Sequence, residues 1–151
     1  MKILVTGGCG YKGSVLIPKL LKEGHEIVSF DSQWFGNKLE SHPNLENIKG
    51  DIRNIESIPF QGFDSVIHLA NIANDPAVEL NPTLSWEVNV LAAYQLADKA
   101  QRNGVKQFIF ASSGSVYGVK DEPKVTEDLI LVPISVYNKT KMVAERVFLS
   151  F

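Results

Sequence analysis

A turn with regularly spaced glycines constrains the fold of this 151-residue chain more than any other feature. The stretch VTGGCGYKG places Gly7, Gly10 and Gly13 three residues apart, directly after the strand-like run KILVT at residues 2–6. An apolar stripe at helical spacing starts at Gly13, and Gly24 is placed to end that helix. A strand, a glycine turn and a helix in this order predict the first unit of a parallel α/β sheet.

Strand-like and helical segments alternate along the rest of the chain. The strand-like runs are mostly apolar, which is typical of strands covered on both faces, and we expect strands at 2–6, 26–30, 45–49, 65–70 and 106–113. Further helices are expected from Asn81-Pro82 to about Asn103-Gly104, and from about Ser135 onward. The middle helix has an inward stripe of Asn89, Ala92, Ala93, Leu96, Ala97 and Ala100. This pattern predicts a Rossmann-type, doubly wound parallel sheet.

Composition excludes several classes of function. The net charge is −2, and Lys and Arg are scattered among Asp and Glu, so we expect neither a nucleic-acid partner nor a membrane surface. No apolar run approaches the roughly 18 residues of a membrane span, and the apolar start is short for a signal peptide. Cys9 is the only cysteine, so no internal disulfide or cysteine metal cluster can form, and we expect no bound metal. The sequence therefore predicts a cytoplasmic protein.

The glycine turn has the chemistry of a nucleotide site. Glycines let the backbone approach a pyrophosphate, and a helix N-terminus offers unpaired N–H groups and a positive dipole end. Gly13 also falls on the sheet-facing stripe, where a missing side chain lets helix and strand pack closely. The turn therefore predicts dinucleotide binding.

Two acidic residues follow strands on the same side of the predicted sheet. Asp31 ends the second strand, where a carboxylate accepts hydrogen bonds from an adenosine ribose and repels a 2′-phosphate, so NAD is preferred over NADP. Asp51, in GDI after the third strand, either accepts from an adenine amino group or caps a turn. His68 lies on an apolar strand, which favours a hydrogen-bonded core histidine over a catalyst.

The end of the chain adds groups for proton transfer. FASSGSVYG follows the fifth strand, and YNKTK opens the last helix, where Tyr137 and Lys141 are one turn apart. A Lys ammonium near the phenol favours the phenolate form of Tyr137. Tyr137 is therefore a candidate base for a sugar hydroxyl, with a Ser hydroxyl orienting the same oxygen.

These motifs together resemble the extended short-chain dehydrogenase/reductases, specifically the NAD-dependent sugar-nucleotide epimerase/dehydratase family. TGGCGYKG resembles the family's TGGxGxxG, GDIRN its acidic adenine contact, and HLAN its HLAA. NVLAAYQLADKA resembles its NVxGT helix, and SSGSVYG with YNKTK resembles its SSxSVYG and YxxSK. The resemblance covers essentially the whole chain and implies an epimerase of the UDP-glucose 4-epimerase kind, with NAD as cofactor and a UDP- or dTDP-sugar as substrate.

The resemblance also implies a set of site residues. Ser113, Tyr137 and Lys141 would be catalytic, and Lys141 would also hold the nicotinamide ribose. Tyr11 and Lys12 would approach the pyrophosphate beside Gly7, Gly10 and Gly13, and Asn89 would brace the site. The remaining cofactor residues would be Asp31 at the ribose, Asp51 and Ile52 at adenine, and Leu69, Ala70 and Asn71 along the dinucleotide.

The departures from the family pattern keep alternatives open. Gly114-Ser115 stands where dehydratases of the family carry Asp-Glu, which disfavours a dehydratase. The later strands and the sugar-nucleotide-binding domain of the family have no counterpart in residues 1–151, so these residues are expected to form an incomplete NAD-binding domain. The alternatives are a truncated, non-catalytic NAD-binding module, one chain of a two-chain enzyme, and an NAD-dependent dehydrogenase or reductase. Self-association, or completion by another chain, is expected through residues 106–151.

Overall fold

The structure, a computed structural model, describes residues 1–151 and contains one parallel sheet. Its strands are β1 (Lys2–Thr6), β2 (Glu26–Asp31), β3 (Leu45–Lys49), β4 (Ser65–His68) and β5 (Gln107–Phe110). Their order is β3-β2-β1-β4-β5, with every neighbouring pair parallel. The predicted Rossmann-type, doubly wound sheet is confirmed, because this order reverses direction beside β1.

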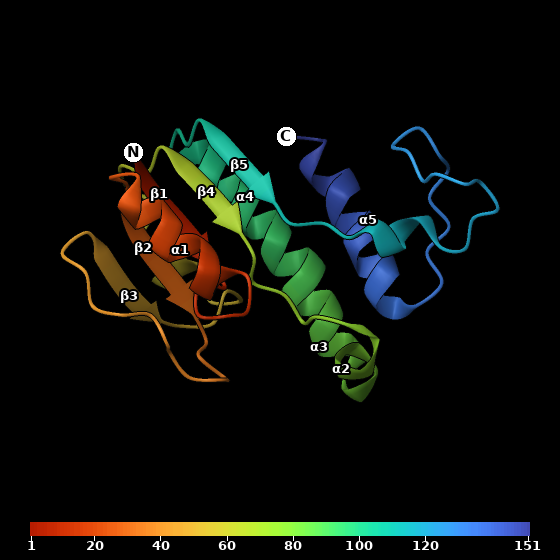
Figure 1. Ribbon diagram of the computed structural model, residues 1–151, viewed down its shortest axis with the longest axis horizontal. Helices are drawn as coiled ribbons and strands as arrows, with labels where there is room; N and C mark the ends of the chain where they lie inside the picture. Colours follow the sequence, from red (N-terminus) through yellow and green to blue (C-terminus); the bar gives the residue numbers. More distant parts are fainter.

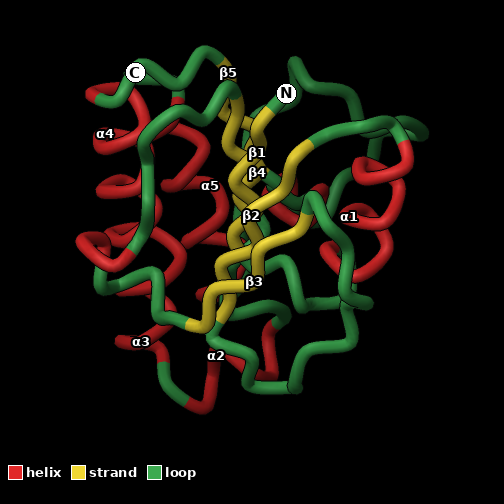
Figure 2. The backbone as a smooth tube through the Cα atoms, turned by 90° about the vertical axis from the view of Figure 1, so that its left-hand side faces the viewer, coloured by secondary structure: helices red, strands yellow, loops and turns green.

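Helices cover both faces of the sheet (Figures 1 and 2). Helix α1 (Gly13–Lys22) lies on one face, while α4 (Ala93–Arg102) and α5 (Val136–Phe148) lie on the other. The core under α1 contains Ile3, Val5, Ile17, Ile27 and Ile67, all buried. The larger core faces α4 and contains Leu4, Val28, Phe30, Val66, Leu96 and Ala100 among its members. The central strands β1, β2 and β4 therefore send alternate side chains into two cores, which explains their mostly apolar sequences.

The strand predictions hold with small changes at the ends. Residues 2–6 and 45–49 are strands as predicted, and β2 extends one residue further, to Asp31. The fourth and fifth strands are shorter than predicted, because β4 stops at His68 and β5 spans only Gln107–Phe110. The apolar runs continue past these points as loop backbone, and the loop that follows β4 contributes to the site described below.

The predicted middle helix is not one regular helix. It consists of α3 (Pro82–Trp86), a π-helical segment (Glu87–Ala92) and α4, and it is preceded by a short helix that the sequence did not predict, α2 (Asp75–Leu80). Asn74 and Asn81 cap α2 and α3 by accepting from the N–H groups of Ala77 and Leu84. The predicted inward stripe is confirmed, since all six of its residues are buried.

Helix α5 begins where predicted. Ser135 caps it by accepting from the N–H of Asn138 at 3.2 Å, and α5 packs beside α4 and the π-helical segment. A long loop precedes α5 and contains a 3₁₀ turn at Gly114–Tyr117 (Figure 1). None of the helices has the length and apolar character needed to cross a bilayer.

Candidate functional site

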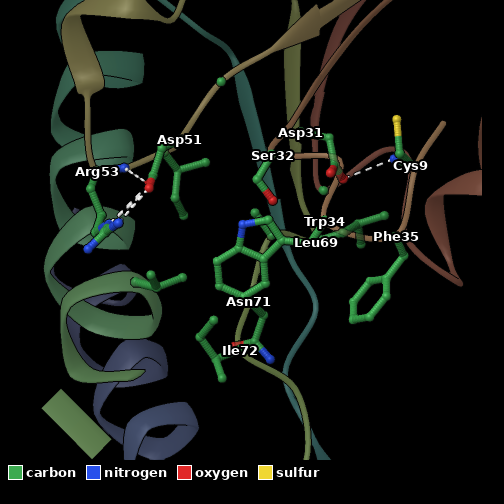
Figure 3. Close-up of a pocket in the computed structure, with 17 residues that line it drawn as sticks. Cys9, Asp31, Ser32, Trp34, Phe35, Asp51, Arg53, Leu69, Asn71 and Ile72 are labelled. Carbon is green, nitrogen blue, oxygen red and sulfur yellow. Dashed lines mark hydrogen bonds and ion pairs between the residues drawn. The ribbon is translucent and has the colours of Figure 1, made fainter. Parts of the chain in front are cut away.

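A pocket opens at the carboxyl ends of the parallel strands, where ligands of such sheets bind (Figure 3). Its wall is formed by the glycine turn, the end of β2, the residues after β3 and the residues after β4. The structure thus brings most of the predicted cofactor residues together in one place: Gly7, Gly10, Asp31, Asp51, Ile52, Leu69, Ala70 and Asn71. Tyr11 and Lys12 are exposed on the adjoining turn, outside the pocket wall.

Three glycines of the turn are required by the packing of the protein itself. Gly7 has a φ of +75°, and a Cβ there would lie 2.5 Å from the backbone N of Ala70. A Cβ on Gly13 would overlap the backbone of Gly8, so the close approach is between the helix start and the turn, not between helix and strand as predicted. The contact with strand and helix falls instead to Gly8, whose Cβ would overlap the side chains of Ser29 and Ile17.

Gly10 is different, because internal packing does not require a glycine there. A Cβ on Gly10 would meet only the carbonyl oxygen of Gly7, at 3.3 Å, and the residue lines the pocket. No side chain caps α1, and the N–H groups of Tyr11, Lys12 and Gly13 have no partner within the protein. An open glycine beside unpaired N–H groups fits the pyrophosphate of a dinucleotide.

Asp31 links the glycine turn to the loop after β2. Its Oδ2 accepts from the N–H of Cys9 at 3.0 Å, and its Oδ1 accepts from the N–H of Gln33 at 2.6 Å. A carboxylate offers about four lone-pair positions, so acceptor capacity remains for a ribose diol. Asp31 therefore shapes the pocket and still presents a negative charge to it.

Asp51 belongs to a small charged network at the opposite wall. Arg53 contacts both carboxylate oxygens of Asp51, with its Nη2 2.7 Å from Oδ2, and its Nη1 lies 3.0 Å from Oε2 of Glu87. The hydrogen bond from Arg53 is the main reason why the pKa of Asp51 is lowered. Asp51 also caps its own turn by accepting from the N–H of Arg53. The carboxylate is therefore ionised and fixed at the pocket wall.

Asn89 lies in the π-helical segment and is fully hydrogen-bonded. Its Oδ1 accepts from the N–H of Ile72 at 2.8 Å, and its Nδ2 donates to the Ile72 carbonyl and to Oγ1 of Thr140, both at 3.1 Å. Thr140 in turn donates to the carbonyl of Tyr137. Asn89 is thus a brace that ties the loop after β4 to α5.

The three predicted catalytic residues lie around the end of β5 but are not hydrogen-bonded to one another. Ser113 shares a 2.7 Å hydrogen bond with the hydroxyl of Ser115. Lys141 is 4% exposed and donates to the carbonyl of Ala111 at 2.8 Å, directly after β5. Tyr137 is half-buried on the first turn of α5, and its hydroxyl has no partner within the protein.

The environment of Lys141 weakens its hold on a proton. Burial, and next the charge of Lys12, lower the pKa of Lys141 to about 8, whereas Glu145 acts in the opposite direction. Glu145 is one turn further along α5 and accepts a short hydrogen bond from Ser112. Lys141 is still mostly protonated at neutral pH, and its Nζ lies 4.4 Å from the centre of the Phe110 ring.

His68 is a core residue, as predicted. It is fully buried, its Nδ1 is hydrogen-bonded to Oγ1 of Thr6 at 2.7 Å, and its ring packs against Phe108, Phe110 and Phe148. Burial, with a smaller contribution from the charge of Lys141, lowers the pKa of His68 to about 3. A histidine held neutral in the core does not take part in the site.

Two kinds of pocket residue escaped the sequence analysis. Arg53 fixes Asp51 but stands two residues after it in an ordinary turn sequence, which gave no signal. Trp34 and Phe35 line the pocket from the loop at 32–44, and two adjacent exposed aromatics in a long loop were a signal that could have been used.

The chain is similar to known proteins over nearly its whole length. Residues 3–151 match the NAD dependent epimerase/dehydratase family. The chain belongs to this family. It is 34% identical over 144 residues to the UDP-glucose 4-epimerase of Corynebacterium glutamicum, a match that covers 94% of this chain and 44% of that relative.

Solved structures of the family show the same arrangement. A UDP-N-acetylglucosamine 4-epimerase from Methanobrevibacter ruminantium, in complex with UDP-N-acetylmuramic acid, matches with a TM-score of 0.92 at 30% identity and covers 99% of this chain and 50% of that one. A Thermus thermophilus UDP-glucose 4-epimerase in complex with NAD matches with a TM-score of 0.89 at 29% identity, again over 99% of this chain and 50% of that one. This epimerase/dehydratase family chain therefore spans about half the length of the relatives that it matches.

Proposed function

We propose that residues 1–151 form the NAD-binding domain of a sugar-nucleotide epimerase. The observation that carries this proposal is the convergence of Gly10, Asp31 and Asp51 in one pocket, with Tyr137 and Lys141 at the end of β5. The relatives named above act on UDP-sugars, and one of them is a complex with NAD. A UDP- or dTDP-sugar is accordingly the proposed substrate.

The pocket suits an adenosine half without a 2′-phosphate. Asp31 would accept from the ribose diol, and Asp51 with Ile52 would contact adenine. Gly7 and Gly10, with the free N–H groups at the start of α1, would hold the pyrophosphate, next to Tyr11, Lys12 and Gly13. Leu69, Ala70 and Asn71 would line the dinucleotide. Because a 2′-phosphate would face the Asp31 carboxylate, NAD is preferred over NADP.

The groups near β5 would carry the proton transfer. Tyr137 would remove the proton of a sugar hydroxyl, and Ser113 would orient that oxygen. The ammonium of Lys141, with the bound cofactor, would favour the phenolate form of Tyr137 and hold the nicotinamide ribose. When bound, NAD supplies a reversible hydride acceptor. The free hydroxyl of Tyr137 supports this role, since no partner within the protein competes for it.

Substrate binding calls for groups beyond those in the pocket. A sugar has to be held within about 3–3.5 Å of the nicotinamide for hydride transfer. The proposed pocket residues are all assigned to the cofactor, so residues 1–151 alone are expected to bind NAD and not to turn over sugar nucleotides. Completion by further residues of the protein, or by a second chain, would supply the grip on the sugar nucleotide.

The cofactor assignment is tested by calorimetric titration of the 151-residue chain with NAD and with NADP. NAD should bind more tightly than NADP. Asp31→Ala should weaken NAD binding and reduce the difference in affinity between the two cofactors. Asp98→Ala is a matched control, because Asp98 lies on α4 and pairs with Arg102 away from the pocket. Equal or tighter binding of NADP would remove the role given to Asp31.

The catalytic assignment is tested in a longer form of the protein that turns over a UDP-sugar. Tyr137→Phe should abolish hydride transfer while NAD affinity changes little, whereas Lys141→Ala should reduce both. Tyr94→Phe is the matched control, since it removes an exposed phenol from α4, away from the pocket and from the end of β5. Full activity of the Tyr137→Phe variant would contradict the mechanism, and enzyme-like epimerisation by residues 1–151 alone would contradict the need for completion.

A further inference from the structure

Two aromatic side chains in the loop after β2 are exposed at the rim of the pocket. Trp34 is 60% exposed and Phe35 is 89% exposed, and both line the pocket that contains Asp31 and Asp51. A large apolar side chain that borders a ligand pocket and is not packed in a core has area available for a ligand. None of the sequence motifs described above includes these residues.

The backbone of this loop holds Trp34 in place. Gln33 has a φ of +57°, a left-handed conformation that costs a residue with a side chain about 1–2 kcal/mol. The hydrogen bond from its N–H to Asp31 stabilises this conformation, and its carbonyl accepts from the N–H of Gly36 at 2.9 Å. The turn at 33–36 is thus built on the Asp31 carboxylate, so the position of Trp34 is coupled to the pocket wall.

The indole of Trp34 reaches into the pocket. Figure 3 shows its ring between Asp51 on one side and Asp31 on the other, above Asn71 and Ile72, while the ring of Phe35 lies apart from it, below Cys9. A base held at Asp51 and a ribose held at Asp31 would leave one flat face of the base toward this space. Aromatic rings stack on the faces of bases in a manner that tolerates any base identity.

We propose that Trp34 is the stacking platform for the adenine of the dinucleotide, an inference that rests on the proposed NAD binding. Trp34 determines affinity for the adenosine half and takes no part in proton transfer. The other walls near Asp51 supply carboxylate, guanidinium and aliphatic groups, so the indole is the aromatic surface between the two acidic residues.

Fluorescence isolates this contact, because Trp86 is the only other tryptophan and lies on α3, outside the pocket. In a Trp86→Phe background, NAD and ADP-ribose should both quench the emission of Trp34. Nicotinamide mononucleotide, which lacks adenine, should leave the emission unchanged. If nicotinamide mononucleotide quenches the emission and ADP-ribose does not, the assignment of Trp34 to the adenine is overturned.

Calorimetry then measures what the stacking contributes. In the same background, Trp34→Ala should weaken NAD binding about ten-fold, and Trp34→Phe by less than about three-fold, since a phenyl ring still stacks. The melting temperatures of the variants, taken without ligand, show whether the fold is retained. The stacking role is overturned, while NAD binding stands, if Trp34→Ala binds NAD as tightly as the parent chain. It is also overturned if Trp34→Ala and Trp34→Phe lose the same NAD affinity. A parent chain that binds neither NAD nor ADP-ribose overturns the proposed function and the role of Trp34 together.

Discussion

At the centre of the sheet, Leu4, Val5 and Ile27 are fully buried between two layers of helices, whereas at its β5 edge Ile109 remains 44% exposed. The two regions differ in their polar groups as well. Asp31, beside β1, places both carboxylate oxygens in hydrogen bonds. On α5, the charge of Lys141 is buried, and Oδ1 of Asn138 is buried without a partner.

This difference separates the part of the chain that provides stability from the part that carries the proposed catalytic groups. Apolar burial at β1, β2 and β4 is the main favourable term in folding, and the glycine turn is locked onto it. Buried polar groups on α5 cost free energy, which natural proteins tolerate at functional sites. Damage to the central region should therefore unfold the chain, and changes near β5 should have smaller effects on stability.

The largest effect is expected at Gly7. Gly7→Ala adds a methyl group 2.5 Å from the backbone N of Ala70, and neither backbone segment can move away easily. We expect a loss of about 3 kcal/mol or more in the free energy of unfolding, measured by urea denaturation.

Gly24→Ala is the matched control for this change. Gly24 has a similar φ of +80°, but a Cβ added there would meet nothing within 4 Å, so only the backbone term of about 1–2 kcal/mol should be lost. If Gly7→Ala and Gly24→Ala lose the same free energy of unfolding, the glycine turn is not packed tightly against Ala70.

A second effect is expected at Asn89, which joins the two regions. Asn89→Ala leaves the N–H and carbonyl of Ile72 without their partner and removes the donor to the Thr140 hydroxyl, and the site is 2% exposed. A buried polar group left unpaired costs about 1–3 kcal/mol, so we expect a loss of about 2–3 kcal/mol in the free energy of unfolding.

Asn103→Ala serves as the comparison for Asn89, because Asn103 is exposed and makes one side-chain hydrogen bond, to the carbonyl of Lys99. Asn103→Ala should lower the free energy of unfolding by less than about 1 kcal/mol. If both asparagines cost the same, the brace between the loop after β4 and α5 does not stabilise the fold.

A third effect concerns pH and His68. The folded state keeps His68 neutral down to about pH 3, while the unfolded chain takes up a proton near the ordinary pKa of 6.5. The unfolded state therefore binds more protons between these values, and stability falls as the pH is lowered. We expect up to about 1.4 kcal/mol of lost stability per pH unit below about 6, from urea denaturation at several pH values.

His68→Phe should flatten this slope, although it lowers the stability at pH 7 by leaving Oγ1 of Thr6 without its partner. A slope that survives in His68→Phe would assign the pH dependence to other groups.

Much of this fold was predictable because its signals are local. β1 and β3 were found at their true bounds from apolar runs, and α1 from its glycine turn and helical stripe. The short helix α2 was missed, although Asn74 followed by Asp75-Pro76 repeats the pattern of Asn81-Pro82 that was used for α3. The π-helical segment at 87–92 was missed because the spacing of apolar residues does not distinguish it from an α-helix.

The candidate site was predictable to a similar extent. Strand-end positions of Asp31 and Asp51 indicated that both would face one pocket, and they do. Other contacts depend on how loops fold back in three dimensions, so the sequence did not reveal them. They are the ion pair of Arg53 with Asp51, the hydrogen bond from Lys141 to Ala111 and the position of Trp34 in the pocket. The roles given to Ser113, Tyr137 and Lys141 stay predictions.

The smallest effect is expected at the exposed edge. Ile109 on β5 faces away from α4, and Leu149 and Phe151 are also exposed near the end of α5. Exposed apolar groups next to a free strand edge favour association with another chain.

We expect the 151-residue chain to self-associate weakly in sedimentation velocity runs over a series of concentrations. Ile109→Lys should lower the association constant about ten-fold, since a lysine would be desolvated in the contact. Val15→Lys is the control, because Val15 is exposed on α1, outside residues 106–151. A chain that stays monomeric at the highest concentration, with no partner present, would contradict the prediction that the β5 region depends on contacts outside residues 1–151.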